Sequence, residues 1–294
     1  MASPDANAEM FITLFSKNNL KNLLEFRLKF GNNIKLDGIV QTIATNCPCL
    51  ESLELISHFN YHENTKLVAI SQMKKLQRLK LSNLGMDPNS YIFIFQDRNL
   101  ENLLQLEILE ISVNSDVIKV ISMNCPKLKV LDLPYYNKKS GLSHISQLEN
   151  LKTLNLMSAR GAVTEDFISL FSNNSKLKNL LELNLTCCEN VNHEVINYVA
   201  TACPNLESLT FFRITKKSTL ISLAQLNKLK SLKICGASSD GLFSLFAKEG
   251  FGNLIELDVS RCYQINNEVM SAIAIGQWFP NNMIIHFGGL SVYF

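Results

Sequence analysis

Apolar residues along the chain follow a recurring pattern, L-x-x-L-x-L, in which Ile, Val or Phe also fills the later positions. The last two apolar positions lie two residues apart, so in a strand they face the same side. Between these motifs the apolar residues recur at three- and four-residue steps, the period of a helix with one buried face. The sequence therefore predicts short strands alternating with short helices. Ten clear copies begin at Leu23, Leu50, Leu76, Leu106, Leu128, Leu151, Leu180, Leu206, Leu229 and Leu254.

The spacing of these copies, 22 to 30 residues, is typical of leucine-rich repeats. No single copy can bury its apolar face, so stacked copies are needed to make one continuous leucine core. We expect an α/β leucine-rich-repeat solenoid, a horseshoe with a parallel sheet on its concave face and helices on its convex face. Residues 1–9 are expected to be a disordered N-terminus. Residues 10–294 are expected to form a single domain, which ends in a degenerate eleventh copy around Ile285 and Phe287.

A longer period is superimposed on the repeat. The dipeptide Cys-Pro occurs at 47–48, 125–126 and 203–204, in two equal steps of 78 residues. Three repeats of about 26 residues account for this step, which indicates a duplicated block of three repeats. In the segment that ends at Pro204, Asn192 is placed to cap the start of a helix, and the proline stops the helix from continuing.

The eight cysteines fit the repeat better than they fit a reactive site. Cys47, Cys125 and Cys203 precede the prolines at predicted helix ends, and Cys188 and Cys262 occupy the bend after a strand, where a polar atom can satisfy backbone groups. No second pair of Cys or His at zinc-ligand spacing accompanies them, and residues 47–49 form C-x-C rather than the redox motif C-x-x-C. We expect reduced thiols with structural roles, no metal site and no cofactor.

Composition excludes several classes of function. The chain has 294 residues, 47% of them hydrophobic, and a formal net charge of only +2, so no strong field attracts nucleic acid. The N-terminus does not resemble a signal peptide, and no apolar run is long enough for a membrane span. We expect a monomer in the cytoplasm or nucleus. None of the common nucleotide-binding, zinc-protease or hydrolase motifs occurs, so the chain is not expected to be an enzyme.

Two segments carry a resemblance to a known family. LNLTCCENVNHEVINYVATACPNLESL and LDVSRCYQINNEVMSAIAIG resemble the cysteine-containing leucine-rich repeat, a subtype found in F-box/LRR proteins. The resemblance implies a protein-binding scaffold that recognises substrates in SCF-type ubiquitin-dependent degradation. Residues 10–15 already align with a repeat helix, so we expect no F-box here and an indirect link to a cullin-RING ligase. The alternative is a stand-alone interaction or inhibitor protein with no ligase role.

The expected partner is a protein or peptide on the concave face or its rim, because residues flanking the buried leucines alternate onto that face. Arg78 and Lys80 are predicted to form part of a basic patch there. Aromatic and arginine residues, which often carry binding energy, follow several strands at the rim. The alternative is that these residues pack against neighbouring loops. The candidate partner-binding residues are Arg78, Lys80, Tyr135, Tyr136, Phe212, Arg213, Arg261 and Tyr263.

Overall fold

The structure is a computed structural model that divides into two compact units, residues 1–148 and 149–294. The predicted single domain stays a prediction. The predicted disorder of residues 1–9 lies outside the described residues. The structure describes residues 13–15, 20–31, 34, 36–58, 66–109, 113–172, 175–212, 223–236, 238–239, 242–243, 252–262, 265–275, 283–288 and 290–293.

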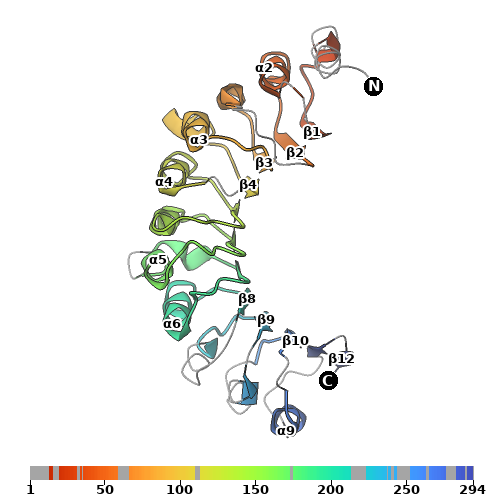
Figure 1. The fold of residues 1–294 in the computed structure, drawn as a ribbon, viewed down its shortest axis with the longest axis vertical. Coiled ribbons are helices and arrows are strands. Elements are labelled where there is room, and N and C mark those ends of the chain that lie inside the picture. The colour runs from red at the N-terminus through yellow and green to blue at the C-terminus, as the bar shows by residue number, and fades with distance from the viewer. Residues whose placement is uncertain are drawn as a thin grey trace. The chain divides into compact units, whose positions relative to one another are not determined.

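In the described part of the first unit, five strands pair in chain order, each parallel to the next. The helices lie along one side of the strands (Figure 1). The strands are β1 (Glu25–Phe30), β2 (Ser52–Ser57), β3 (Arg78–Ser82), β4 (Gln105–Leu109) and β5 (Val130–Asp132). The α-helices are α2 (Leu36–Asn46), α3 (Pro88–Phe95) and α4 (Ser115–Asn124), and the 3₁₀ helices are η1 (Val68–Gln72), η2 (Gln96–Arg98) and η3 (Leu142–Gln147).

The second unit repeats this arrangement from β6 to β11, again with parallel neighbours in chain order. A final strand, β12, pairs antiparallel with β11. The strands are β6 (Thr153–Asn155), β7 (Glu182–Leu185), β8 (Ser208–Phe212), β9 (Ser231–Cys235), β10 (Glu256–Arg261), β11 (Ile284–Phe287) and β12 (Leu290–Tyr293). The helices are α5 (Thr164–Leu170), η4 (Leu177–Asn179), α6 (His193–Ala202) and α9 (Asn267–Ile275).

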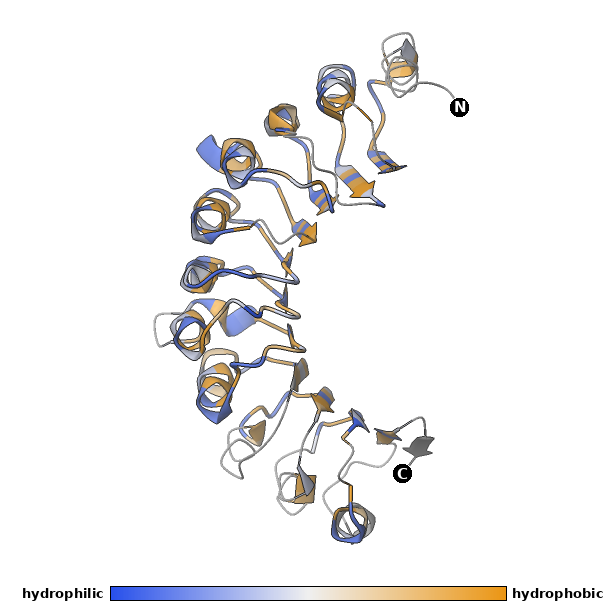
Figure 2. Ribbon diagram, viewed as in Figure 1, coloured by the Kyte–Doolittle hydropathy of each residue, from blue (hydrophilic) through white to orange (hydrophobic). Residues whose placement is uncertain are grey.

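One ladder of apolar side chains runs through each unit between the strands and the helices. In the first unit Leu53, Leu79, Leu106 and Leu131 are in register on neighbouring strands, and each is at most 1% exposed. In the second unit the ladder is Leu154, Leu183, Leu209, Leu232, Leu257 and Ile285, each at most 2% exposed. Apolar and polar residues accordingly occur together in the strands and helices that are coloured in Figure 2. The predicted α/β leucine-rich-repeat solenoid is confirmed.

The fourth copy of the repeat lies three residues earlier than predicted. The sequence analysis placed it at Leu106, Leu109 and Ile111, whereas the structure buries Leu103, Leu106 and Ile108. Pairing with β3 establishes this alignment of the fourth copy, because Leu79 pairs with Leu106 and Leu81 pairs with Ile108. The surrounding intervals become 27 and 25 residues instead of 30 and 22, which makes the repeat more regular.

The eleventh copy is present as β11, and the chain then turns back. Gly288 has a left-handed φ of 45° between β11 and β12, a conformation that glycine adopts without the steric penalty of a Cβ. The antiparallel pairing of β12 was not predicted, because the sequence analysis considered only repeats that continue in the parallel direction. Strand β12 therefore covers the outer edge of β11.

Polar side chains in the connections between strands and helices form hydrogen bonds to backbone N–H and carbonyl groups. Asn192 caps α6 through its Oδ1, which accepts hydrogen bonds from the backbone N–H groups of Glu194 and Val195 at 3.0 and 3.2 Å. The thiols of Cys188 and Cys262 donate to the carbonyl oxygens of Leu156 and Ile234, at 3.0 and 3.3 Å. The predicted structural roles of these residues are confirmed.

All eight cysteines are free thiols, and six of them are buried. Burial raises the pKa of Cys125, Cys188 and Cys203 to about 12. These thiols consequently stay protonated near neutrality and make poor nucleophiles. Among the described residues no group of His, Cys, Asp and Glu side chains is arranged to hold a metal ion, and none of the described helices is long and apolar enough to cross a bilayer.

Candidate partner-binding surface

The sheet face, which we define as the side of the strands opposite the buried ladder, carries rows of side chains in strand register. In the first unit one row consists of Arg27, Glu54, Lys80, Glu107 and Asp132. Neighbouring strands lie about 4.8 Å apart, so residues in one row can touch. The charges alternate over the first four positions of this row.

Ion pairs neutralise the first four charges of this row. Arg27 binds Glu54 through two nitrogens, Nη2 at 2.7 Å from Oε1 and Nε at 2.5 Å from Oε2, and the hydrogen bond to Glu54 raises the pKa of Arg27. Lys80 pairs with Glu107. Arg27, Glu54, Lys80 and Glu107 are therefore paired with one another, while Lys29 on β1 is exposed and forms no ion pair within the described residues.

Arg78 shares this behaviour, although its partner is two strands away. Its guanidinium reaches across β2 to Oε1 of Glu25 at 2.5 Å, and Ser52, which lies in register between the two residues, is only 7% exposed. Arg78 and Lys80 were predicted to form part of a basic patch. The structure differs because a carboxylate from another strand faces each cation.

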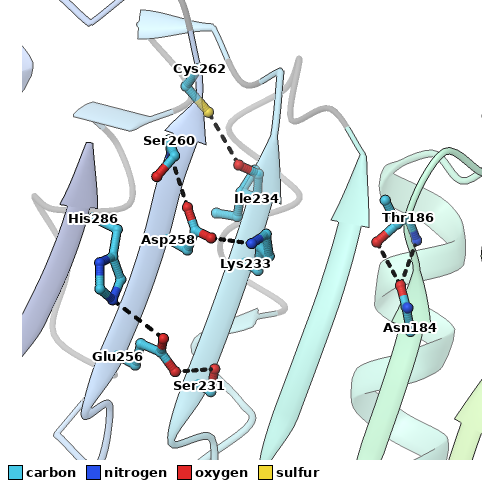
Figure 3. Close-up of polar contacts among 10 residues, drawn as sticks. All are labelled: Asn184, Thr186, Ser231, Lys233, Ile234, Glu256, Asp258, Ser260, Cys262 and His286. Atoms are coloured by element: carbon cyan, nitrogen blue, oxygen red, sulfur yellow. Dashed lines mark hydrogen bonds and ion pairs between the residues drawn. The ribbon is translucent and has the colours of Figure 1, made fainter. Parts of the chain in front are cut away.

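In the second unit the corresponding row is mostly uncharged, and local hydrogen bonds hold three of its side chains in place. The row runs through Asn155, Asn184, Thr210, Lys233, Asp258 and His286. Oδ1 of Asn184 accepts hydrogen bonds from the backbone N–H and the hydroxyl of Thr186, at 2.9 and 2.6 Å (Figure 3). Oδ1 of Asn155 and of Asp258 each accept the N–H two residues later. These side chains are consequently fixed without a partner protein.

The adjacent row of the second unit contains two carboxylates separated by small hydroxyl side chains. Glu182, Ser208, Ser231 and Glu256 follow one another in register. Glu256 accepts a hydrogen bond from Ser231 at 3.1 Å and lies 3.3 Å from Nε2 of His286 (Figure 3). Glu182 is exposed, and its carboxylate meets only the Thr153 hydroxyl, at 3.5 Å, within the described residues. This row is the acidic part of the face.

The Lys233–Asp258 pair keeps the neighbouring row neutral (Figure 3). Burial of the Asp258 carboxyl disfavours its charged form, but hydrogen bonds from Lys233 and Ser260 outweigh this effect, and the pKa of Asp258 is lowered from its ordinary value. The carboxylate is therefore already satisfied and is not available to a partner's cation in the way that Glu182 is.

The predicted rim residues lie in different environments. Tyr135 follows β5 with a left-handed φ of 66°, and it is 47% exposed. Tyr136 is only 1% exposed, and its hydroxyl donates to the carbonyl oxygen of Ser140. Tyr136 is thus a packed residue, as the alternative reading of the sequence had it, while Tyr135 remains a candidate.

The second unit places two of the predicted residues close together. Phe212 ends β8 and Arg261 ends β10, and both are in register with Cys235 on the strand between them. Arg261 is exposed, while Cys235 is buried. For Phe212 only the backbone is described. Arg213 and Tyr263 lie outside the described residues, so their roles stay predictions.

Ser208, Ser231 and His286 belong to these rows but were not among the predicted face residues. Ser208 and Ser231 stand two residues after the first leucine of their repeats, where simple alternation predicts them on the face. His286 was missed because its repeat is degenerate. Pairing of β10 with β11, which aligns Asp258 with His286, is the structural signal that places it.

Two known proteins are similar to parts of the chain. No protein-family model matches the chain. A segment of 167 residues, 54% of the chain, is 29% identical to the DNA repair protein rhp7 of Schizosaccharomyces pombe, and the match spans 29% of rhp7. Among solved structures, a leucine-rich-repeat protein of Leptospira interrogans aligns with 90% of this chain and 80% of its own, at 19% identity and a TM-score of 0.35. Solenoids of this class generally serve as protein-binding scaffolds.

Proposed function

We propose that the chain is a protein-binding scaffold that recognises a substrate protein for SCF-type ubiquitin-dependent degradation, with an adaptor supplying the link to a cullin-RING ligase. The observation that carries the binding role is the in-register sheet face, on which neighbouring groups fix the side chains of Asn155, Asn184 and Asp258. The link to ubiquitination rests on the cysteine-containing repeats, in which Cys188 and Cys262 occupy the same position of the bend.

Fixed side chains favour binding because less conformational freedom is lost when the complex forms. In the second unit Asn184 is held through its Oδ1, and its Nδ2 has no partner among the described residues. Together with the exposed carboxylate of Glu182, this leaves one amide donor and one anion directed to the face. A partner segment that offers a carbonyl oxygen and a lysine or arginine side chain fits this arrangement.

Affinity capture from cells tests the ligase link. The full chain, tagged and expressed in cells, is expected to co-purify with a cullin and its adaptor, because substrate recognition of this type requires both. Recovery of partner proteins with neither component present would favour the alternative, a stand-alone interaction or inhibitor protein. A variant carrying Glu182→Lys serves as the binding control in the same experiment.

Charge reversal on the sheet face tests the binding site itself. Glu182→Lys is expected to weaken binding of the captured partner about tenfold, because it replaces an attractive charge with a like charge. Glu189→Lys, at an exposed turn of the same unit, makes the same change in net charge away from the face. Titration by fluorescence anisotropy should show little effect for the control, and equal weakening by both variants would contradict the sheet-face site.

A further inference from the structure

Basic residues outnumber acidic residues in the turns that lead into the strands, and acidic residues are in excess elsewhere in the chain. The turns that lead into β1–β10 contain ten of the 28 Lys and Arg residues but only four of the 26 Asp and Glu residues. This leaves 18 basic and 22 acidic residues for the rest of the chain. The turns comprise residues 20–24, 47–51, 73–77, 99–104 and 125–129 in the first unit and residues 149–152, 175–181, 203–207, 226–230 and 252–255 in the second.

Each unit has the same imbalance, five lysines against two glutamates. In the first unit the five are Lys21, Lys74, Lys75, Lys127 and Lys129, which we call the lysine edge, and all are exposed. The glutamates in the same turns are Glu51 and Glu101.

Hydrogen bonds of the lysine edge leave its positive charge uncompensated. Nζ of Lys74 donates to Oδ1 of Asn99 at 2.6 Å, and Nζ of Lys127 donates to Oδ1 of Asn102 at 2.8 Å. Nζ of Lys75 lies 3.4 Å from the sulfur of Cys49. These acceptors are neutral, and none of the five lysines forms an ion pair within the described part of the chain. The amides therefore orient the ammonium groups without cancelling their charge.

The sheet face of the same unit shows the opposite arrangement. Arg27, Arg78 and Lys80 each pair with a carboxylate of another strand. A charged partner gains little from groups that are already paired, since it would have to replace an existing interaction. The lysine edge thus carries five cations without an ion pair among the described residues, whereas Arg27, Arg78 and Lys80 of the predicted basic patch are already paired.

We propose that the lysine edge docks an acidic segment of a partner protein. Five successive turns separated by about 4.8 Å extend over about 19 Å, which matches an extended segment of about six residues at about 3.3 Å each. Leu24, which is 51% exposed in the first of these turns, offers an apolar contact at one end. This surface differs from the sheet face, so the inference does not rest on the function proposed above.

The composition of the turns favours protein over nucleic acid as the partner. Single-stranded nucleic acids bind where aromatic side chains stack on the bases, and the turns of the first unit contain no aromatic residue. Glu51 and Glu101 interrupt the row of lysines and repel a continuous chain of phosphates, whereas an acidic peptide can place neutral residues opposite them.

Binding of a fluorescein-labelled peptide of eight residues, Asp-Asp-Gly-Asp-Asp-Gly-Asp-Asp, to the full chain tests the proposal, because its glycines can lie opposite Glu51 and Glu101. In fluorescence anisotropy at about 50 mM salt, the triple variant Lys74→Gln, Lys75→Gln and Lys127→Gln is expected to bind about tenfold more weakly than the unaltered protein. The difference should shrink at about 0.5 M salt because exposed charges are then screened. Circular dichroism and thermal melting of the variant establish that it is folded.

A second triple variant provides a control of equal charge. Lys119→Gln, Lys138→Gln and Lys139→Gln removes three exposed lysines of the same unit outside the edge, and it should change peptide affinity by less than about twofold. Equal loss in both variants would mean that net charge alone attracts the peptide and would overturn the proposal. Tighter edge-dependent binding of oligo(dT), or of vesicles containing phosphatidylserine, would overturn the choice of partner.

Discussion

Replacing Leu154 with alanine is expected to lower the free energy of unfolding by about 2–5 kcal/mol. Leu154 is fully buried in β6 and is in register with Leu183 of β7. Truncation removes apolar contacts and leaves a cavity that the neighbouring strand cannot fill, because its position is fixed by the ladder of backbone hydrogen bonds. Urea denaturation of the variant and the unaltered protein, followed by far-UV circular dichroism, measures the difference.

Ile255→Ala is the matched control for this substitution. Ile255 is an aliphatic residue of similar size in the same unit, immediately before β10, but it is 53% exposed. Its replacement is expected to change the free energy of unfolding by about 0.5 kcal/mol or less, as for ordinary surface positions. A loss below about 1 kcal/mol for Leu154→Ala, or equal losses for both variants, would remove Leu154 from the continuous core.

The fold could be predicted because the same apolar motif recurs many times along the chain. A single L-x-x-L-x-L motif is weak, whereas ten at near-equal spacing leave few alternatives to stacked parallel strands. The fourth copy shows the limit. Between residues 101 and 111, leucine or isoleucine occupies positions 103, 104, 106, 108, 109 and 111, so two alignments fit the motif. Pairing with the neighbouring strands selects one of them, and that information is not local.

The charged rows of the sheet face were only partly predicted. One row consists of residues that follow one another at the repeat period, Arg27, Glu54, Lys80 and Glu107. Aligning the copies of the repeat would therefore have predicted that positive and negative charges alternate along this row. Considering each strand alone led to a basic patch at Arg78 and Lys80. The Arg78–Glu25 pair spans two strands, 53 residues apart, and only the side-chain geometry shows it.

Loop residues were the least predictable part of the candidate site. Tyr135 and Tyr136 are adjacent aromatic residues after the same strand, yet one is 47% exposed and the other 1%. Their difference follows from the turn, in which Tyr135 has a positive φ and Tyr136 points inward to the carbonyl oxygen of Ser140. A period-two pattern carries no information about residues beyond the end of a strand.

Stability is expected to fall steeply when the pH rises above about 9. Burial raises the pKa of Cys125, Cys188 and Cys203 to about 12 in the folded chain, against about 8.5–9 for a thiol in the unfolded chain. Below the unfolded pKa both states hold these protons and the full stability is present. Between about pH 9 and 12 the unfolded state loses the protons first, so unfolding becomes progressively more favourable.

The expected slope follows from the number of protons. Once the unfolded thiol is ionised, each buried thiol lowers the free energy of unfolding by about 1.4 kcal/mol per pH unit. Three such thiols together lower it by about 4 kcal/mol per pH unit. Urea unfolding at pH 8, 9, 10 and 11 under reducing conditions measures this slope. Cys203→Ala should lower the slope, whereas Met123→Ala, at an exposed position without a titratable group, should leave it unchanged. An equal slope in the unaltered protein and in Cys203→Ala would show that the buried thiols do not govern the alkaline transition.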